Sequence, residues 1–409
     1  MEYGLIGEKL GHSFSAEVHS KIADYKFELH EVPTEKIDEF MSAKNFCGIN
    51  VTIPYKQTVI PYLDFVDENA LKIGAVNTVV NKSGKLYGYN TDFGGLLALI
   101  NRKFDDLTGK KVLILGGGAT AKTARAVLEY LNAAEILTVS RMPKNNQISY
   151  SDAITVHKNA SVIINATPVG MHPNIDNTPI SLKEFSNLEL VVDVIYNPLR
   201  TKLLIEAESL GITAFSGLYM LVAQAVLAAE YFTENHFSTD VIEDIYNQLK
   251  NKKENIVLIG MPASGKTTIG KILSEKTGKK FIDTDELIVN KTGKQITDIF
   301  NEVGEVGFRK IEREVIKEIS TETSSVIATG GGAILDFDNL VSLMHNGKIV
   351  FLDRPLSELL PTFDRPLANS KEQIIKRYNE RIDLYNSASE LTVNVTNPEE
   401  TAKKILNNI

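Results

Sequence analysis

The chain has 409 residues, of which 43% are hydrophobic and 23% charged, and its net charge is −8. This length predicts two or three domains of a globular protein, and the acidic balance gives no support for nucleic-acid binding. A single cysteine, Cys47, excludes an intrachain disulfide framework and fits a reducing cytoplasm. The N-terminus lacks the pattern of a secretory signal, and the longest nearly apolar stretch, residues 218–229, is too short to span a membrane.

Four short polar motifs occur within the first hundred residues. They are G-H-S-F-S at 11–15, G-I-N-V-T-I-P-Y-K at 48–56, G-A-V-N-T at 74–78 and G-Y-N-T-D-F-G at 88–94. Each motif alone is a weak signal. Considered by itself, a lysine such as Lys56 is more often exposed to solvent, and an aspartate such as Asp92 more often caps a helix.

A glycine loop then follows an expected strand at residues 111–115 and precedes an expected helix. It reads G-x-G-x-x-A over 116–121, which is the dinucleotide-binding arrangement. The residues expected to bind the dinucleotide here are Gly116, Gly117, Gly118, Ala119 and Ala121.

The strand after this loop, expected at residues 135–141, indicates which dinucleotide is bound. It ends in Ser140 and Arg141, with Lys144 close behind, where an NAD site usually has an acidic residue. A guanidinium at this point suits a 2′-phosphate, so NADP is favoured over NAD. The alternative is that Arg141 is an ordinary solvated arginine.

Three further motifs complete the set: N-A-T-P-V-G-M at 165–171, D-V-I-Y-N-P at 193–198 and M-L-V-A-Q at 220–224. Their order and spacing, with the earlier motifs, resemble shikimate dehydrogenase across nearly all of residues 1–250. The resemblance implies NADPH-dependent reduction of 3-dehydroshikimate to shikimate, with Lys56 and Asp92 as the catalytic pair, and it adds Gly217 to the NADP-binding residues. The implied substrate-binding residues are Ser13, Ser15, Thr52, Asn77, Asp92, Tyr196 and Gln224.

These residue types suit ketone reduction. Hydride transfer to a ketone leaves a developing alkoxide, and a lysine can supply both positive charge and a proton. A ring acid rich in hydroxyls needs several short polar groups around it. Which of Lys56 and Asp92 performs the formal proton transfer is left open.

The junction between the two halves is expected near residue 253. Residues 240–250 predict an amphipathic helix, and the polar stretch 250–255 separates it from the apolar run 256–259.

That apolar run predicts a strand leading into G-M-P-A-S-G-K-T at 260–267, a phosphate-binding loop followed by a helix. Backbone N–H groups and the helix N-terminus would face phosphate oxygens, Lys266 would reach the β- and γ-phosphates, and Thr267 would bind Mg²⁺. Ala263 stands where many related loops have glycine. The expected ATP-binding residues are Gly260, Ala263, Ser264, Gly265, Lys266, Thr267, Thr268 and Arg365.

Five later motifs occur in order: F-I-D-T-D at 281–285, G-E-V-G-F-R-K-I-E at 304–312, G-G-G at 330–332, D-R-P-L at 364–367 and E-R-I-D-L-Y at 380–385. The first reads as a strand end whose two carboxylates share one side.

Over residues 254–409 this order resembles shikimate kinase. The resemblance places Asp283 at Mg²⁺ and makes Lys266 and Asp285 catalytic, with Asp285 also binding the substrate. It puts Arg365 on a lid near 355–370 that is shorter than in many relatives. The implied substrate-binding residues are Asp285, Arg309, Gly330, Gly331, Gly332 and Arg381.

The expected fold class is α/β throughout. A substrate domain with a mostly parallel sheet should comprise residues 1–95 and 221–250, a Rossmann-like NADP domain 96–220, and a P-loop kinase with a flanked parallel sheet 254–409. Shikimate, the product of the first implied reaction, is the substrate of the second, so a fused bifunctional enzyme is the main interpretation.

Three alternatives are kept: a dehydrogenase with relaxed use of quinate and NAD, a chain in which one half only binds or scaffolds, and a gluconate-type kinase. The last leaves the upstream motifs unexplained. The sequence does not decide the oligomeric state.

Overall fold

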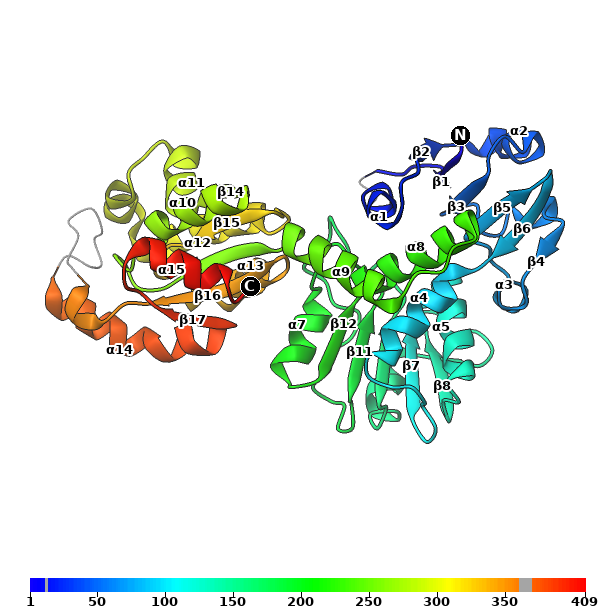
Figure 1. Ribbon diagram of the computed structural model, residues 1–409. Coiled ribbons are helices and arrows are strands. Elements are labelled where there is room, and N and C mark those ends of the chain that lie inside the picture. Colours follow the sequence, from blue (N-terminus) through cyan, green and yellow to red (C-terminus); the bar gives the residue numbers. More distant parts are fainter. Residues whose placement is uncertain (12–13, 360–369) are drawn as a thin grey trace. The chain divides into compact units, whose positions relative to one another are not determined.

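The computed structural model describes residues 1–11, 14–359 and 370–409 (Figure 1). Contacts divide the chain into two compact units, Met1–Asn197 with Glu206–Leu249, and Pro198–Ile205 with Lys250–Ile409. Two sheets lie in the first unit and one in the second, each with helices packed beside it, so the expected α/β class is confirmed. No helix within the described ranges is long and apolar enough to cross a membrane.

The first sheet has the strand order β2-β1-β3-β5-β6-β4, and β5 alone runs against the others. Its strands are β1 (Tyr3–Gly7), β2 (Phe27–Glu31), β3 (Gly48–Val51), β4 (Phe65–Val66), β5 (Thr78–Lys82) and β6 (Lys85–Tyr89). The helices in this part are α1 (Ser15–Ile22), α2 (Ile37–Ala43) and α3 (Glu68–Ile73), with short 3₁₀ turns η1 (Thr34–Lys36) and η2 (Ile60–Tyr62).

The second sheet is parallel in every pairing, with the order β12-β11-β10-β7-β8-β9. Its strands are β7 (Lys111–Leu115), β8 (Glu135–Val139), β9 (Gln147–Ile148), β10 (Val162–Asn165), β11 (Leu190–Asp193) and β12 (Thr213–Ser216). Helices α5 (Ala119–Tyr130), α6 (Tyr150–Thr155) and α7 (Lys202–Ser209) connect them. The strand order reverses beside β7, and such a switch point is where open α/β sheets bind ligands.

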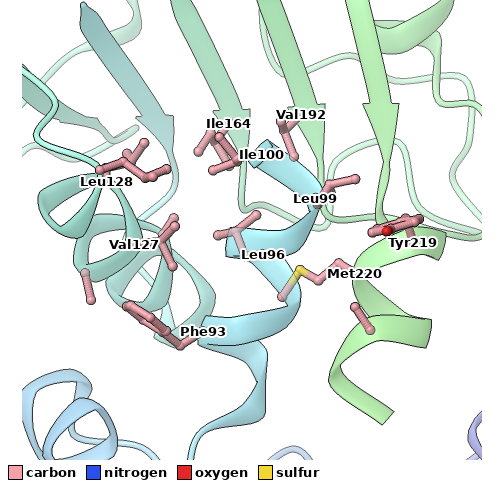
Figure 2. Packing of buried hydrophobic residues seen from close by; sticks show 14 of the residues in the cluster. Phe93, Leu96, Leu99, Ile100, Val127, Leu128, Ile164, Val192, Tyr219 and Met220 are labelled. Atoms are coloured by element: carbon pink, nitrogen blue, oxygen red, sulfur yellow. The ribbon is translucent and has the colours of Figure 1, made fainter. Parts of the chain in front are cut away.

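Two helices belong to the hydrophobic core of the second sheet, while the first sheet has a core cluster of its own. Helix α4 (Thr91–Asn101) packs closely on α8 (Gly217–Thr233), and a Cβ atom at Gly95 would lie only 2.8 Å from the Met220 carbonyl oxygen. Figure 2 shows Leu96 and Ile100 of α4 packed with Val127 of α5 and Ile164 of β10. This buried cluster holds the start of α4 in place.

Helix α9 (Thr239–Lys253) extends further than the sequence suggested. The polar residues Lys250–Lys253 form its last turn instead of an irregular connection, and β13 begins two residues later, at Asn255. Lysines in a last turn interact favourably with the negative end of the helix dipole, which a reading based on hydrophobic periodicity does not detect.

The third sheet is also fully parallel, with the order β14-β15-β13-β16-β17, so the loop after the central strand β13 lies at a switch point. Its strands are β13 (Asn255–Ile259), β14 (Lys280–Asp283), β15 (Ser325–Ala328), β16 (Gly347–Asp353) and β17 (Leu391–Asn394). The helices are α10 (Lys266–Thr277), α11 (Thr284–Thr292), α12 (Ile296–Ile319), α13 (Phe337–Met344), α14 (Lys371–Ala388) and α15 (Pro398–Leu406), with η3 (Ala333–Leu335) and η4 (Leu356–Glu358).

Candidate active sites

Lys56 and Asp92 come together in the first unit. The Lys56 ammonium lies 2.5 Å from the Asp92 carboxylate, and their side chains are 21% and 18% exposed. Lys56 stands in the loop after β3, and Asp92 in the first turn of α4, where a helix N-terminus favours a carboxylate. Asn90 caps α4 by accepting from the Phe93 amide and also donates to the Ala75 carbonyl, which fixes the start of this helix.

Asn77 and Gln224 both meet the hydroxyl of Thr91, beside Asp92. The Asn77 amide oxygen accepts from the Thr91 backbone N–H at 2.7 Å and from its hydroxyl at 3.2 Å. The Gln224 side-chain oxygen lies 3.5 Å from the same hydroxyl, while its NH₂ group donates to the Leu221 carbonyl. Sequence reasoning did not assign Thr91 a role. Its position at a helix start between Asn90 and Asp92 was the available signal.

The remaining substrate candidates are spread over several segments. Ser15 is buried at the first turn of α1, and Thr52 is half-buried just beyond β3. The Tyr196 ring centroid lies 5.3 Å from that of Phe14, and burial raises the pKa of the Tyr196 phenol. Ser13 lies outside the described residues.

The dinucleotide loop connects β7 to α5. Gly116 has φ +104°, and a Cβ atom there would lie 2.9 Å from the Thr167 methyl group. Gly118 is the N-cap of α5, and a Cβ atom there would meet nothing within 4 Å, so the backbone is open to an approaching phosphate. Ala119 and Ala121 form the first turn of α5. This cradle fits a dinucleotide pyrophosphate. Gly217, at the start of α8, packs against the Val194 carbonyl, which leaves no room for a side chain.

Two exposed cations lie beyond the next strand. Ser140 follows β8, and the Arg141 and Lys144 side chains are exposed to solvent. The Ser140 hydroxyl accepts from the Met142 N–H, and the Lys144 N–H donates to Gln147, so the turn is fixed by its own polar groups. Both cations therefore stay available to an anionic ligand.

The phosphate-binding loop lies between β13 and α10. The buried Lys266 donates to the carbonyls of Gly260 and Met261, each at 2.9 Å. Gly265 is the N-cap of α10 with φ +96°, so the first amides of the helix can face a phosphate. Ala263 has φ +62°, a left-handed conformation that glycine adopts more readily. Ser264 is buried in the loop, and Thr268 lies in the first turn of α10.

Thr267 and Asp283 are brought together as an oxygen pair suited to Mg²⁺. The Thr267 hydroxyl donates to the Asp283 carboxylate at 2.8 Å. Strand β14 ends at Asp283, whose carboxylate caps α11 through the Asp285 and Glu286 amides. Asp285 is therefore a helical residue, and the expectation that strand alternation aligns the two aspartates is wrong, because the cap ends the strand first.

The triple glycine lets three segments approach closely. A Cβ atom at Gly330 would lie 2.9 Å from carboxylate oxygens of both Asp285 and Glu312, and one at Gly332 would overlap the Arg309 guanidinium. At Gly331 it would collide with Pro262 of the phosphate loop. Asp285, Arg309 and the phosphate loop therefore meet around these glycines.

The two expected substrate arginines are held differently. Arg309, on the part of α12 that follows a break at Gly304, lies 2.6 Å from Glu312 and 3.2 Å from Glu305. Burial opposes the charge of Arg309, but the Glu312 and Glu305 carboxylates together outweigh this effect and raise the pKa of Arg309. Arg381, on α14, is buried and donates to the Gly331 carbonyl at 3.0 Å.

Sequence reasoning missed two residues of this region. Glu312 is fully buried, burial raises its pKa, and its Oε1 lacks a hydrogen-bond partner within the described chain. Arg377 lies one turn before Arg381, and both line a pocket of about 420 Å³. Burial and the charges of Arg381 and Arg309 lower the pKa of Arg377. The i, i+4 spacing from Arg381 was the signal for Arg377. Arg365 and most of the expected lid lie outside the described residues.

Comparison with known proteins agrees with both sites. Residues 5–79 match the shikimate dehydrogenase substrate binding domain, and residues 262–409 match shikimate kinase. A shikimate dehydrogenase (NADP(+)) from Clostridium perfringens is 38% identical over 266 residues, covering 61% of this chain and 98% of the relative. The chain belongs to the shikimate dehydrogenase family, fused to a shikimate kinase domain.

Solved structures support the membership. A chorismate mutase/shikimate 5-dehydrogenase fusion protein from Clostridium acetobutylicum aligns with a TM-score of 0.58 and 34% identity, covering 61% of this chain and 97% of that one. Shikimate 5-dehydrogenase from Thermus thermophilus, solved with NADP(H) and shikimate, aligns with a TM-score of 0.55 and 27% identity, covering 61% and 99%. The dehydrogenase family thus accounts for the N-terminal three-fifths, and the kinase domain for the remainder.

Proposed function

We propose that Lys56 and Asp92 form the catalytic pair of an NADPH-dependent reductase that converts 3-dehydroshikimate to shikimate. The observation that carries this proposal is the 2.5 Å contact between the two side chains beside Asn77, Thr91 and Gln224. Bound NADPH would supply the hydride. Lys56 would stabilise the developing alkoxide and deliver its proton, and Asp92 would orient the ammonium and bind a ring hydroxyl.

The kinase half would phosphorylate the shikimate made by the first reaction. Lys266 would leave the Gly260 and Met261 carbonyls to contact the ATP phosphates, while Thr267 and Asp283 would hold Mg²⁺ against them. Asp285 would accept from the reacting hydroxyl, and Arg309 and Arg381 would bind the substrate carboxylate. Family membership confirms the two reaction classes and their cofactors, NADP, ATP and Mg²⁺.

Reciprocal variants test this assignment. Lys56→Ala should lower the rate of NADPH oxidation by about 10²-fold or more, because a positioned proton donor is lost, and should leave shikimate phosphorylation intact. Lys266→Met should abolish phosphorylation and leave ketone reduction intact. Each variant thus serves as the folding control for the other, and unchanged NADPH oxidation in Lys56→Ala would remove this residue from the mechanism.

Several features of this account are further proposals. We place the dehydrogenase in residues 1–253, with 96–220 as its NADP domain, and the kinase in 254–409. We propose a cytoplasmic location because the chain has one cysteine. Use of quinate with NAD is the second candidate for the first half, and the exposed Arg141 and Lys144 argue against it, since both favour a 2′-phosphate.

A further inference from the structure

A chain of buried polar side chains runs from α1 to the proposed substrate site. The His19 imidazole, fully buried and stacked on Phe27, has Nδ1 2.5 Å from the Tyr25 hydroxyl and Nε2 3.0 Å from the Asn50 side-chain oxygen. The Asn50 NH₂ group lies 3.1 Å from the Thr78 hydroxyl and 3.4 Å from the Asn77 backbone carbonyl. The proposed mechanism uses neither His19 nor Asn50.

Fixed backbone groups decide the direction of these hydrogen bonds. The Asn77 carbonyl can only accept, so Asn50 must turn its NH₂ group toward it and its amide oxygen toward His19. His19 must then carry its proton on Nε2, which leaves Nδ1 to accept from the Tyr25 hydroxyl. Burial lowers the pKa of His19 to about 3, so the imidazole is neutral at neutral pH.

The same direction continues toward the substrate site. Because Thr78 accepts from Asn50, its own proton points onward to the Asn77 amide oxygen at 3.2 Å or to the Thr91 hydroxyl at 3.1 Å. The Asn77 amide oxygen also receives the Thr91 backbone N–H. With its oxygen saturated, Asn77 presents its NH₂ group, which has no hydrogen-bond partner among the residues that the structure describes.

We propose that His19 is a positioning residue for ketone reduction: as the neutral Nε2–H tautomer it orients Asn50, and through Thr78 fixes Asn77 with its NH₂ group toward an oxygen of the substrate ring. This inference rests on the proposed reductase function. With the His19 proton on Nδ1 instead, Asn50 would turn its side-chain oxygen toward the backbone carbonyl of Asn77 and the Thr78 hydroxyl. Thr78 would then donate its proton to Asn50 and no longer to the side-chain oxygen of Asn77.

The tautomer can be measured directly. In the full chain labelled with ¹⁵N-histidine, NMR at pH 7 should show His19, assigned by its loss in His19→Gln, with a protonated Nε2 and an accepting Nδ1. A protonated Nδ1 or an imidazolium would overturn the proposal, whatever the chain catalyses.

The functional consequence appears in KM. His19→Leu should raise the KM for 3-dehydroshikimate about ten-fold, as expected when a binding group is mispositioned, with a much smaller change in kcat. His19→Gln, which keeps a donor for Asn50, should restore KM to near the unmodified value. A purely structural role would instead reduce the active fraction, lowering apparent kcat at constant KM. Phosphorylation of shikimate by the same chains measures the concentration of folded kinase.

Tyr25→Phe keeps the test decisive if His19→Leu does not fold. It removes only the hydroxyl that donates to Nδ1, while the Asn50 oxygen still holds the proton on Nε2, so the Nε2–H signal and KM should both stay close to those of the unmodified chain. A proton on Nδ1 with an unchanged KM, or a raised KM with the proton still on Nε2, would overturn the proposal. If the unmodified chain does not reduce 3-dehydroshikimate at all, the proposed function fails, and the tautomer measurement still judges the hydrogen-bond direction.

Discussion

Acid should destabilise the first unit through His19. In the unfolded chain this imidazole titrates near its ordinary pKa of 6.5, whereas burial lowers the pKa to about 3 in the folded chain. Between these values the unfolded chain binds the additional proton, so folding stability is complete above pH 6.5 and decreases as the pH falls toward 3. The polar neighbours Tyr25 and Asn50 are uncharged and give the imidazolium no compensating carboxylate.

The expected effect follows from the two pKa values. At pH 5, which is 1.5 units below the ordinary pKa of 6.5, His19 is protonated in the unfolded chain and still neutral in the folded chain. This difference of 1.5 units lowers the free energy of unfolding by about 2 kcal/mol. At pH 7.5 the loss is close to zero. Most single domains have only about 5–15 kcal/mol of stability, so this loss should be measurable.

The assay is urea unfolding at pH 7.5 and pH 5.0, followed by pulse proteolysis and quantification of the N-terminal half. His19→Gln is the matched control, because it keeps a polar side chain that does not titrate, and carboxylates elsewhere titrate equally in both chains. The unmodified chain should lose about 2 kcal/mol more than the variant between the two pH values. Equal losses would show that His19 is protonated without cost, and the account of its burial would be refuted.

Two further predictions concern ligand binding. Arg141→Asp should flatten or reverse the preference for NADPH over NADH, since a carboxylate repels a 2′-phosphate and can accept from a 2′-hydroxyl; equal use of both cofactors by the unmodified chain would contradict the role of Arg141. Asp283→Asn should chiefly weaken Mg²⁺-dependent turnover of the kinase, because Asp283 faces Thr267, and Asp285→Asn should chiefly weaken the handling of shikimate. Identical Mg²⁺ titrations of the two variants would show that their roles are not separate.

Local sequence signals predicted the parts of the fold that depend on local geometry. Both glycine loops stand between a strand and a helix, as the sequence predicts. The prediction is possible because a run of apolar residues followed by glycines can be recognised within about ten residues. Asp285 was misplaced because the capping bonds of Asp283, which end β14, depend on backbone geometry. The last turn of α9 was missed because its lysines carry no hydrophobic period.

Long-range contacts account for what the sequence could not supply. The spacing from Arg381 indicates that Arg377 shares its face of α14, but only the fold shows that Glu305 of α12 and Leu335 of η3 line the same pocket. The link from His19 through Asn50 to Thr78 joins residues from α1, β3 and β5, and its meaning depends on the direction of each hydrogen bond. Such a network can be identified only once the three-dimensional arrangement of the strands is known.

The central claim is that one chain carries two consecutive activities, and a coupled assay tests it most directly. The purified chain is given 3-dehydroshikimate, NADPH, ATP and Mg²⁺, and NADPH, shikimate and shikimate 3-phosphate are each quantified over time. We predict that every NADPH oxidised yields one shikimate, which is then converted to shikimate 3-phosphate, and that omitting ATP leaves shikimate as the end product. Oxidation of NADPH without any phosphorylated product, or phosphorylation of added shikimate without reduction of 3-dehydroshikimate, would contradict the account.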